Sequence, residues 1–143
     1  MVRPEVASQK IARASARLEQ AETLLSRPRE EFLADPRSRD LASFYLLLAI
    51  QEVIDLAAHW VADAGWPAPA DASSTFDLLA DHGAIERKLA DGLRGAAELR
   101  NRIAHGYSGV DHARLHEEFQ AGVTTLRRFL VAVAGTAGVQ GST

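Results

Sequence analysis

The stretch YLLLAIQEVIDLAAHW, residues 45–60, decides the fold class of this chain. Its apolar residues surround a helix on nearly all sides, which is typical of an element in the middle of a helical core. We expect these residues to lie in a long helix that begins after Pro36 and runs to about Ala64. Gly65 and the two prolines that follow it should end that helix.

Four more helices are predicted around this central element, because apolar residues recur there every three or four positions. The expected helices cover roughly residues 5 to 26, Ser74 (as N-cap) to Gly83, about 84 to 104, and Asp111 (as N-cap) to Gly135. The first should bury Ile11, Ala14, Leu18, Ala21 and Leu25. Strand-like alternation with hairpin dipeptides is absent from the sequence. We therefore predict an all-α, up-and-down bundle of about five helices.

The composition indicates one globular domain over residues 1–143, with a frayed tail from about residue 136. Hydrophobic residues make up 47% of the chain and charged residues 24%, an ordinary balance. The chain has no cysteine, which excludes disulfides, thiolate metal sites and a cysteine nucleophile. Neither a signal peptide nor a stretch of transmembrane length is expected. We therefore expect a cytoplasmic protein that does not contact a membrane.

The charge distribution limits how the chain could bind nucleic acid. The net charge is -3, whereas a protein that coats nucleic acid non-specifically needs an excess of basic residues. We therefore expect no DNA binding, and any contact with RNA must be local. Only Lys10 and Lys88 are lysines among the 16 Lys and Arg residues, so the positive charge is almost entirely guanidinium. Guanidinium groups suit two-pronged contacts with phosphate.

Arg100 interrupts the apolar face of the predicted helix 84–104. It lies about 60° from Ile85 around the helix axis, in the sector that should face the core. Because a buried charge is costly unless it is paired, Arg100 should meet a carboxylate, a phosphate or a subunit boundary. A structural salt bridge is the plain alternative to a functional role.

His105 lies four residues after Asn101, so the amide could fix the orientation of the imidazole for proton transfer. The alternative is a histidine that simply places a favourable charge at the C-terminal end of a helix. Arg100 and His105 are five residues apart and diverge by about 140° on one helix. They converge only if the arginine bends, the helix end unwinds, or a partner subunit contributes.

The combination of Arg100-Asn101 with His105-Gly106-Tyr107, at the end of an amphipathic helix and before a glycine-rich turn, resembles the HepT-like toxins of the HEPN superfamily. Residues 45–60 look like the second helix of that family, and residues 76–79 look like its short third helix. The resemblance covers roughly residues 10 to 130. Its most specific part is the Arg-x4-His-x-Tyr motif itself.

This resemblance implies the toxin of a bacterial type VII toxin–antitoxin system. Such a toxin is a metal-independent endoribonuclease without a cofactor, in which Arg100 and His105 are catalytic. It works as a homodimer whose two motifs face each other across the subunit boundary. An MntA-like nucleotidyltransferase antitoxin inactivates it by adding AMP to the tyrosine that matches Tyr107.

The residue chemistry agrees with RNA cleavage. The 2'-hydroxyl of RNA can attack the adjacent phosphate, which requires proton transfer and stabilisation of added negative charge. An imidazole and a guanidinium supply these two functions. Two alternatives stay open: a non-catalytic helical module that docks a nucleotidyltransferase or a nucleotide, and an oligomeric bundle in which Arg100 forms an intersubunit salt bridge.

Other polar residues have supporting roles in this prediction. Glu52, Asp55 and His59 form a polar stripe on the central helix, which supplies only part of a metal coordination shell. We expect Glu52 and Asp55 to belong to a network that orients Arg100 or His105, or to a purely structural one. Tyr107 could stack on a base or bind a phosphate, or it could be a hydrophobic plug after the helix end. The remaining histidines, His82, His112 and His116, are expected to be solvated.

Overall fold

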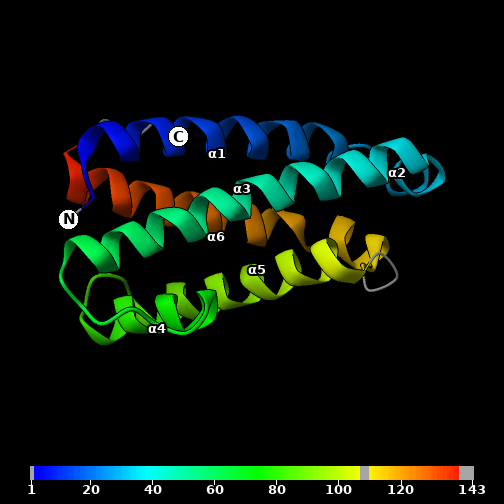
Figure 1. Cartoon of the computed structure of the whole chain (residues 1–143). Coiled ribbons are helices and arrows are strands. Elements are labelled where there is room, and N and C mark those ends of the chain that lie inside the picture. The colour runs from blue at the N-terminus through cyan, green and yellow to red at the C-terminus, as the bar shows by residue number, and fades with distance from the viewer. Residues whose placement is uncertain (1, 107–109, 139–143) are drawn as a thin grey trace.

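The computed structural model describes residues 2–106 and 110–138 (Figure 1). Within these ranges the chain forms six α-helices and no strand: α1 (Pro4–Leu25), α2 (Arg29–Ala34), α3 (Pro36–Asp63), α4 (Ala72–Asp81), α5 (Arg87–Gly106) and α6 (His112–Ala137). The predicted all-α fold is confirmed. The seam predicted for the first helix is also confirmed, because all five of its residues are buried on α1.

Helix α3 is the central element and contacts each of the other five helices. It buries one long apolar face: Ala42, Leu46, Ala49, Ile50, Val53, Leu56, Ala57, Trp60 and Val61. Its opposite face stays open to solvent and includes Phe44, which is 49% exposed. Helix α3 therefore has an inner side, which packs against the core, and an outer side, which lies between α1 and α5.

By length and composition α3 could cross a membrane, since it has 28 residues and a mean hydropathy of 1.6 in its most apolar window. This contradicts the expectation that no stretch reaches transmembrane length. The core helix of a globular protein passes the same test, and here part of the apolar surface of α3 is buried against the rest of the bundle, while Leu41 and Phe44 remain exposed.

The short helix α2 was not predicted. Its six residues are too few to show a helical period, and prolines precede it and follow it. The helix nevertheless anchors its part of the chain, because Phe32 is fully buried in the common core. The two long antiparallel helices α1 and α3 are thus joined through a packed helical turn.

Several predicted helix ends are wrong by two or three residues, and α5 begins at Arg87 instead of about residue 84. The N-cap of α4 is Asp71, whose side chain accepts a hydrogen bond from the backbone N–H of Ser74 at 2.8 Å. Ser74 itself lies in the first turn. Helix α6 continues through Gly135 and ends at Gly138, whose φ of +72° is the left-handed conformation that suits glycine. The predicted cap at Asp111 is confirmed.

The two ends of the bundle differ in what they contain. At one end, α4 packs against α5 and α3, and the ring of Phe129 on α6 lies 6.1 Å from that of Trp60 and 5.8 Å from that of Phe76. The other end, on the right in Figure 1, contains α2, the C-terminus of α5 and the start of α6. The aromatic cluster and the motif residues therefore lie at opposite ends.

Candidate functional site

Arg100 projects from α5 toward the outer side of α3. Its Nη1 donates a hydrogen bond to Oε1 of Gln51 at 2.7 Å. Its Nε is buried and has no hydrogen-bond partner in residues 2–106 and 110–138. No carboxylate in those ranges forms an ion pair with Arg100. Within the described part of the subunit, Arg100 is therefore held by a neutral amide, and no carboxylate offsets its charge.

This arrangement suits the binding of an anion. A buried N–H without a partner costs about 1–3 kcal/mol, and a guanidinium has five such donors to satisfy. A phosphate oxygen in front of Arg100 would satisfy the remaining donors and neutralise the charge in one step. The plain alternative, a structural salt bridge to Arg100, is not formed in the described part of the subunit.

Asn101 and His105 lie on the exposed side of α5, and no hydrogen bond joins their side chains in the structure. His105 is in the last turn, and α5 remains helical through Gly106. The helix therefore does not unwind before His105, so Arg100 and His105 keep the divergence of about 140° that their spacing imposes. Tyr107, the third residue of the motif, lies outside the described residues.

Glu52 and Asp55 form no hydrogen bond or ion pair with Arg100, Asn101 or His105. Lys10 of α1 lies between them, with Nζ 3.3 Å from Oε2 of Glu52 and 3.4 Å from Oδ2 of Asp55. Arg13 adds a longer contact of 3.9 Å to Oε1 of Glu52. The predicted network exists, but it joins α3 to α1 instead of orienting Arg100 or His105, because both carboxylates lean to the α1 side of α3.

Gln51 is the residue that the sequence analysis missed. It is exposed on the outer face of α3, on the side that reaches α5, where it accepts the hydrogen bond of Arg100. A single glutamine beside the acidic residue Glu52 carries no functional signal in the sequence. Its position on the same helix face as the exposed Phe44, seven residues earlier, was the only available hint.

His112 is not solvated as predicted. It is half-buried at the start of α6, with Nε2 3.4 Å from Oγ of Ser43 on α3. Burial lowers the pKa of His112, and the positive charge of Arg39 lowers it further against the opposing effect of Asp40 and Asp111. The imidazole is therefore held toward its neutral form and joins α6 to α3.

The other two histidines also make defined contacts. His116 is half-buried, with Nε2 2.7 Å from the backbone oxygen of Arg27, and its ring lies 5.3 Å from that of Phe32. Its predicted solvation is therefore wrong as well. His82 is exposed and stacks on Trp66 with ring centroids 3.9 Å apart. These contacts are structural and leave His105 as the exposed histidine of the motif helix.

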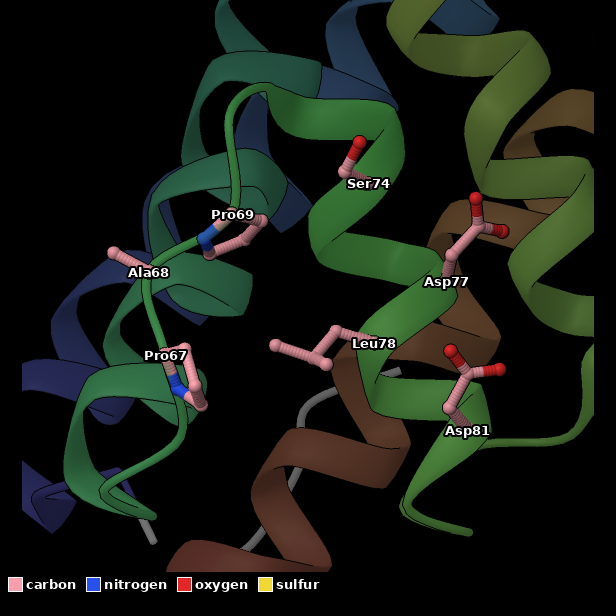
Figure 2. Close-up of a pocket in the computed structure, with 7 residues that line it drawn as sticks. All are labelled: Pro67, Ala68, Pro69, Ser74, Asp77, Leu78 and Asp81. Atoms are coloured by element: carbon pink, nitrogen blue, oxygen red, sulfur yellow. The ribbon is translucent and has the colours of Figure 1, made fainter.

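A hollow of about 360 Å³ lies at the end of the bundle away from Arg100, between α4 and the proline-containing loop before it (Figure 2). Leu78 points toward Pro67 across it, while Asp77 and Asp81 project from the other side of α4. There Arg87 pairs with both carboxylates and Arg94 pairs with Asp77 at 3.4 Å. The charges at this end are mutually neutralised.

No group of three His, Asp or Glu side chains comes together as a metal site in residues 2–106 and 110–138. Glu52 and Asp55 of α3 are bound to Lys10, and Asp77 and Asp81 of α4 are bound to Arg87. The motif residues within the described ranges offer a guanidinium at Arg100 and an imidazole at His105.

Comparisons with known proteins agree on one family. The sequence model of the ribonuclease HepT-like family matches residues 14–133. A protein of Archaeoglobus fulgidus, named as a candidate RNase, is 38% identical over 69 residues. That match covers 48% of this chain and 52% of the archaeal protein, so the chain spans about half the length of this relative.

Solved structures show the same fold. A tri-AMPylated HEPN toxin of Shewanella oneidensis, in complex with an MNT antitoxin, superimposes with a TM-score of 0.84 at 21% identity. The match covers 91% of this chain and 97% of that one. A toxin–antitoxin crystal structure with AMP-PNP gives a TM-score of 0.85 at 20% identity, over 92% and 98% of the two chains. Because the family model spans most of the sequence, the chain belongs to the HepT-like ribonuclease family.

Proposed function

We propose that this protein is a ribonuclease toxin that cleaves RNA without a metal ion, using Arg100 and His105. The observation that carries the proposal is the environment of Arg100, whose guanidinium meets a neutral amide and retains a buried N–H without a partner. The exposed His105 on the same helix supplies a group for proton transfer. The archaeal relative named as a candidate RNase supports the same activity.

In the proposed reaction, the 2'-oxygen of one nucleotide forms a bond to the adjacent phosphorus, and the bond to the 5'-oxygen of the next nucleotide breaks. His105 takes the proton of the attacking hydroxyl or delivers one to the leaving oxygen. Arg100 binds the non-bridging phosphate oxygens, on which negative charge increases in the transition state. The products are a 2',3'-cyclic phosphate and a free 5'-hydroxyl.

A homodimer would complete this site. Within one subunit, Arg100 is held by Gln51 and diverges from His105 on a helix that stays intact, so the proposed site draws on two copies of α5. The outer face of α3 supplies an apolar surface for a second copy, because Phe44 is 49% exposed and Leu41 36%. A Phe44→Glu variant should be monomeric in size-exclusion chromatography with light scattering and should lose RNA cleavage. A monomeric wild-type protein that cleaves RNA would rule out the composite site.

The proposed regulation is AMPylation of Tyr107 by a nucleotidyltransferase antitoxin of the MntA type. The HEPN toxin that superimposes on this chain is tri-AMPylated and bound to an MNT antitoxin, which supports this proposal. Each AMP would place a negatively charged group two residues from His105, where it would compete with the RNA phosphate. In this proposal the toxin and its antitoxin are cytoplasmic, and the toxin cleaves RNA there. Mass spectrometry of the protein co-expressed with its antitoxin should show AMP increments that a Tyr107→Phe variant lacks.

The decisive experiment is cleavage of total RNA by purified wild-type protein and by His105→Ala, in EDTA and with folding checked by circular dichroism. Cleavage that leaves 5'-hydroxyl ends and is lost only in the variant supports the proposal. Unmodified wild-type protein that does not cleave RNA would instead favour a non-catalytic module that docks a nucleotidyltransferase or a nucleotide.

A further inference from the structure

A groove of about 370 Å³ lies between α1 and α3, beside Arg100 but on the other side of Gln51. Its walls are the basic and amide side chains of Arg13, Arg17 and Gln20 on α1 and of Gln51 on α3. Leu48 forms an apolar part of the lining. Ala16 also lines the groove, so the basic and amide groups border a surface that is otherwise mostly apolar.

The groove carries a net positive charge. Nη1 of Arg17 donates to the neutral amide Oε1 of Gln20 at 3.0 Å, and no carboxylate in residues 2–106 and 110–138 pairs with Arg17. Arg13 is 54% exposed and lies 3.9 Å from Glu52, the one acidic residue of the lining. The closer partner of Glu52 is Lys10, at 3.3 Å. Two guanidiniums thus face a carboxylate that is already bound to a lysine.

Gln51 connects this groove to Arg100. It lines the groove and also accepts the hydrogen bond of Arg100. Three guanidiniums, those of Arg13, Arg17 and Arg100, therefore lie along one route from α1 to α5, which crosses α3 at the level of Gln51, about two helical turns from Phe44. Arg13 and Arg17 are one helical turn apart, about 6 Å along the axis, which is comparable to the separation of successive phosphates in a single strand.

We propose that this groove binds the RNA backbone on one side of the cleaved bond, with Arg13 and Arg17 contacting phosphates next to the one held by Arg100. The inference rests on the proposed ribonuclease function and extends it to a second subsite. Single-stranded RNA is recognised by phosphate contacts together with polar groups that reach sugars and base edges. The amides of Gln20 and Gln51 offer such donors and acceptors beside the two arginines.

The test measures binding separately from cleavage. A fluorescent single-stranded RNA with 2'-O-methyl groups cannot be cleaved by its own 2'-oxygen, so its anisotropy reports affinity alone. The Arg13→Ala/Arg17→Ala double variant is compared with Arg29→Ala/Arg128→Ala. This control removes two other exposed arginines that form no ion pair in the described part of the chain. Circular dichroism verifies that both variants fold.

The Arg13/Arg17 variant should lose on the order of tenfold in affinity at low salt, whereas the control should keep it. Each lost phosphate contact should flatten the plot of log affinity against log salt by about 0.7, so the slope should fall by roughly 1.4. With cleavable RNA, the KM should rise while the kcat changes little, because neither arginine touches the reacting phosphate.

Unchanged RNA affinity and salt slope in the Arg13/Arg17 variant would overturn the inference and leave the proposed function intact. So would a variant that keeps its RNA affinity but loses binding to the antitoxin protein, because the groove would then be a protein-docking site. A wild-type protein that neither binds nor cleaves RNA would overturn the proposed function itself. These outcomes are distinguishable in the same set of titrations.

Discussion

The two halves of α5 carry arginines in opposite environments. In the first half, Arg87 and Arg94 pair with the carboxylates of Asp77 and Asp81 on α4. In the second half, Arg100 meets only the amide of Gln51 and leaves its Nε without a partner within the described subunit. The same residue type on one helix is thus neutralised at one end and left charged at the other.

This difference in pairing indicates that the first half of α5 contributes to stability and the second half to function. Paired charges near the surface contribute at most about 1 kcal/mol each and leave nothing for a ligand. An uncompensated guanidinium contributes no ion pair to the fold but binds a phosphate without first breaking one. Changes in the second half of α5 should therefore affect activity, and changes in the first half should affect stability.

The largest effect is expected for Arg100→Ala, which should lower the kcat of RNA cleavage by about 100- to 1,000-fold, because a donor to the transition-state phosphate is lost. Arg94→Ala, the matched change in the first half, should leave the kcat within about twofold. Single-turnover cleavage of a defined RNA oligonucleotide measures both. Equal losses in the two folded variants would remove the distinction between the halves.

A Gln51→Glu substitution would make the second half resemble the first. The new carboxylate would pair with Arg100 and compete with the RNA phosphate, so cleavage should fall by roughly tenfold, about 1.4 kcal/mol. Gln51→Ala serves as the control, because it removes the amide without adding charge, and its loss should be clearly smaller. If Gln51→Glu and Gln51→Ala cleaved RNA equally well, the uncompensated charge of Arg100 would not be what RNA cleavage depends on.

Two glycines in the first half of α5, Gly92 and Gly95, test whether this half contributes to the stability of the fold. A Cβ at Gly92 would lie 2.9 Å from Cγ2 of Thr125, whose hydroxyl donates to the backbone oxygen of Ala121 and thereby holds the side chain in place. A Cβ at Gly95 would meet nothing within 4 Å. Gly95→Ala should therefore raise the free energy of unfolding by about 0.5–1 kcal/mol, and Gly92→Ala should lower it by about 1 kcal/mol.

Urea denaturation followed by circular dichroism measures both changes, and RNA cleavage per folded molecule should stay the same. A gain of stability in Gly92→Ala equal to that in Gly95→Ala would show that α6 can retreat from α5, so that the first half would not be tightly packed.

The smallest effect expected is a pH dependence of the free energy of unfolding. It arises from His112, which follows α5 in the chain at the start of α6. Burial and the charge of Arg39 lower the pKa of His112 below its ordinary value of 6.5. Between that lowered value and about 6.5 the unfolded chain binds a proton that the folded chain does not, so the free energy of unfolding should fall as the pH decreases through this window. Above it, the stabilisation is fully present.

A His112→Gln variant should lose this part of the pH dependence. Urea denaturation of both proteins at about pH 7.5 and about pH 5.5 gives the comparison. A wild-type protein whose stability falls no more than that of the variant would show that Asp40 and Asp111, which favour the charged imidazole, outweigh burial.

Helix type and position were largely predictable from the sequence because they depend on local periodicity. The apolar run at residues 45–60, the seam of α1 and the cap at Asp111 each reflect interactions within a few residues. Helix α2 was missed for the same reason, since six residues show no period and the burial of Phe32 depends on distant helices.

The motif residues Arg100 and His105 were identifiable from their spacing and from the resemblance to the family, but their partners were not. Whether Arg100 meets a carboxylate or an amide depends on which residue of α3 faces α5, and Glu52 and Gln51 differ by one position, about 100° around the helix. Because of this difference in direction, Glu52 pairs with Lys10 on α1 and Gln51 accepts a hydrogen bond from Arg100 on α5. The sequence by itself determined the helices and the chemical groups of the motif, because these are local properties. Only the tertiary structure decided which arginine stays charged, because pairing is set by how helices distant in the chain are rotated against each other.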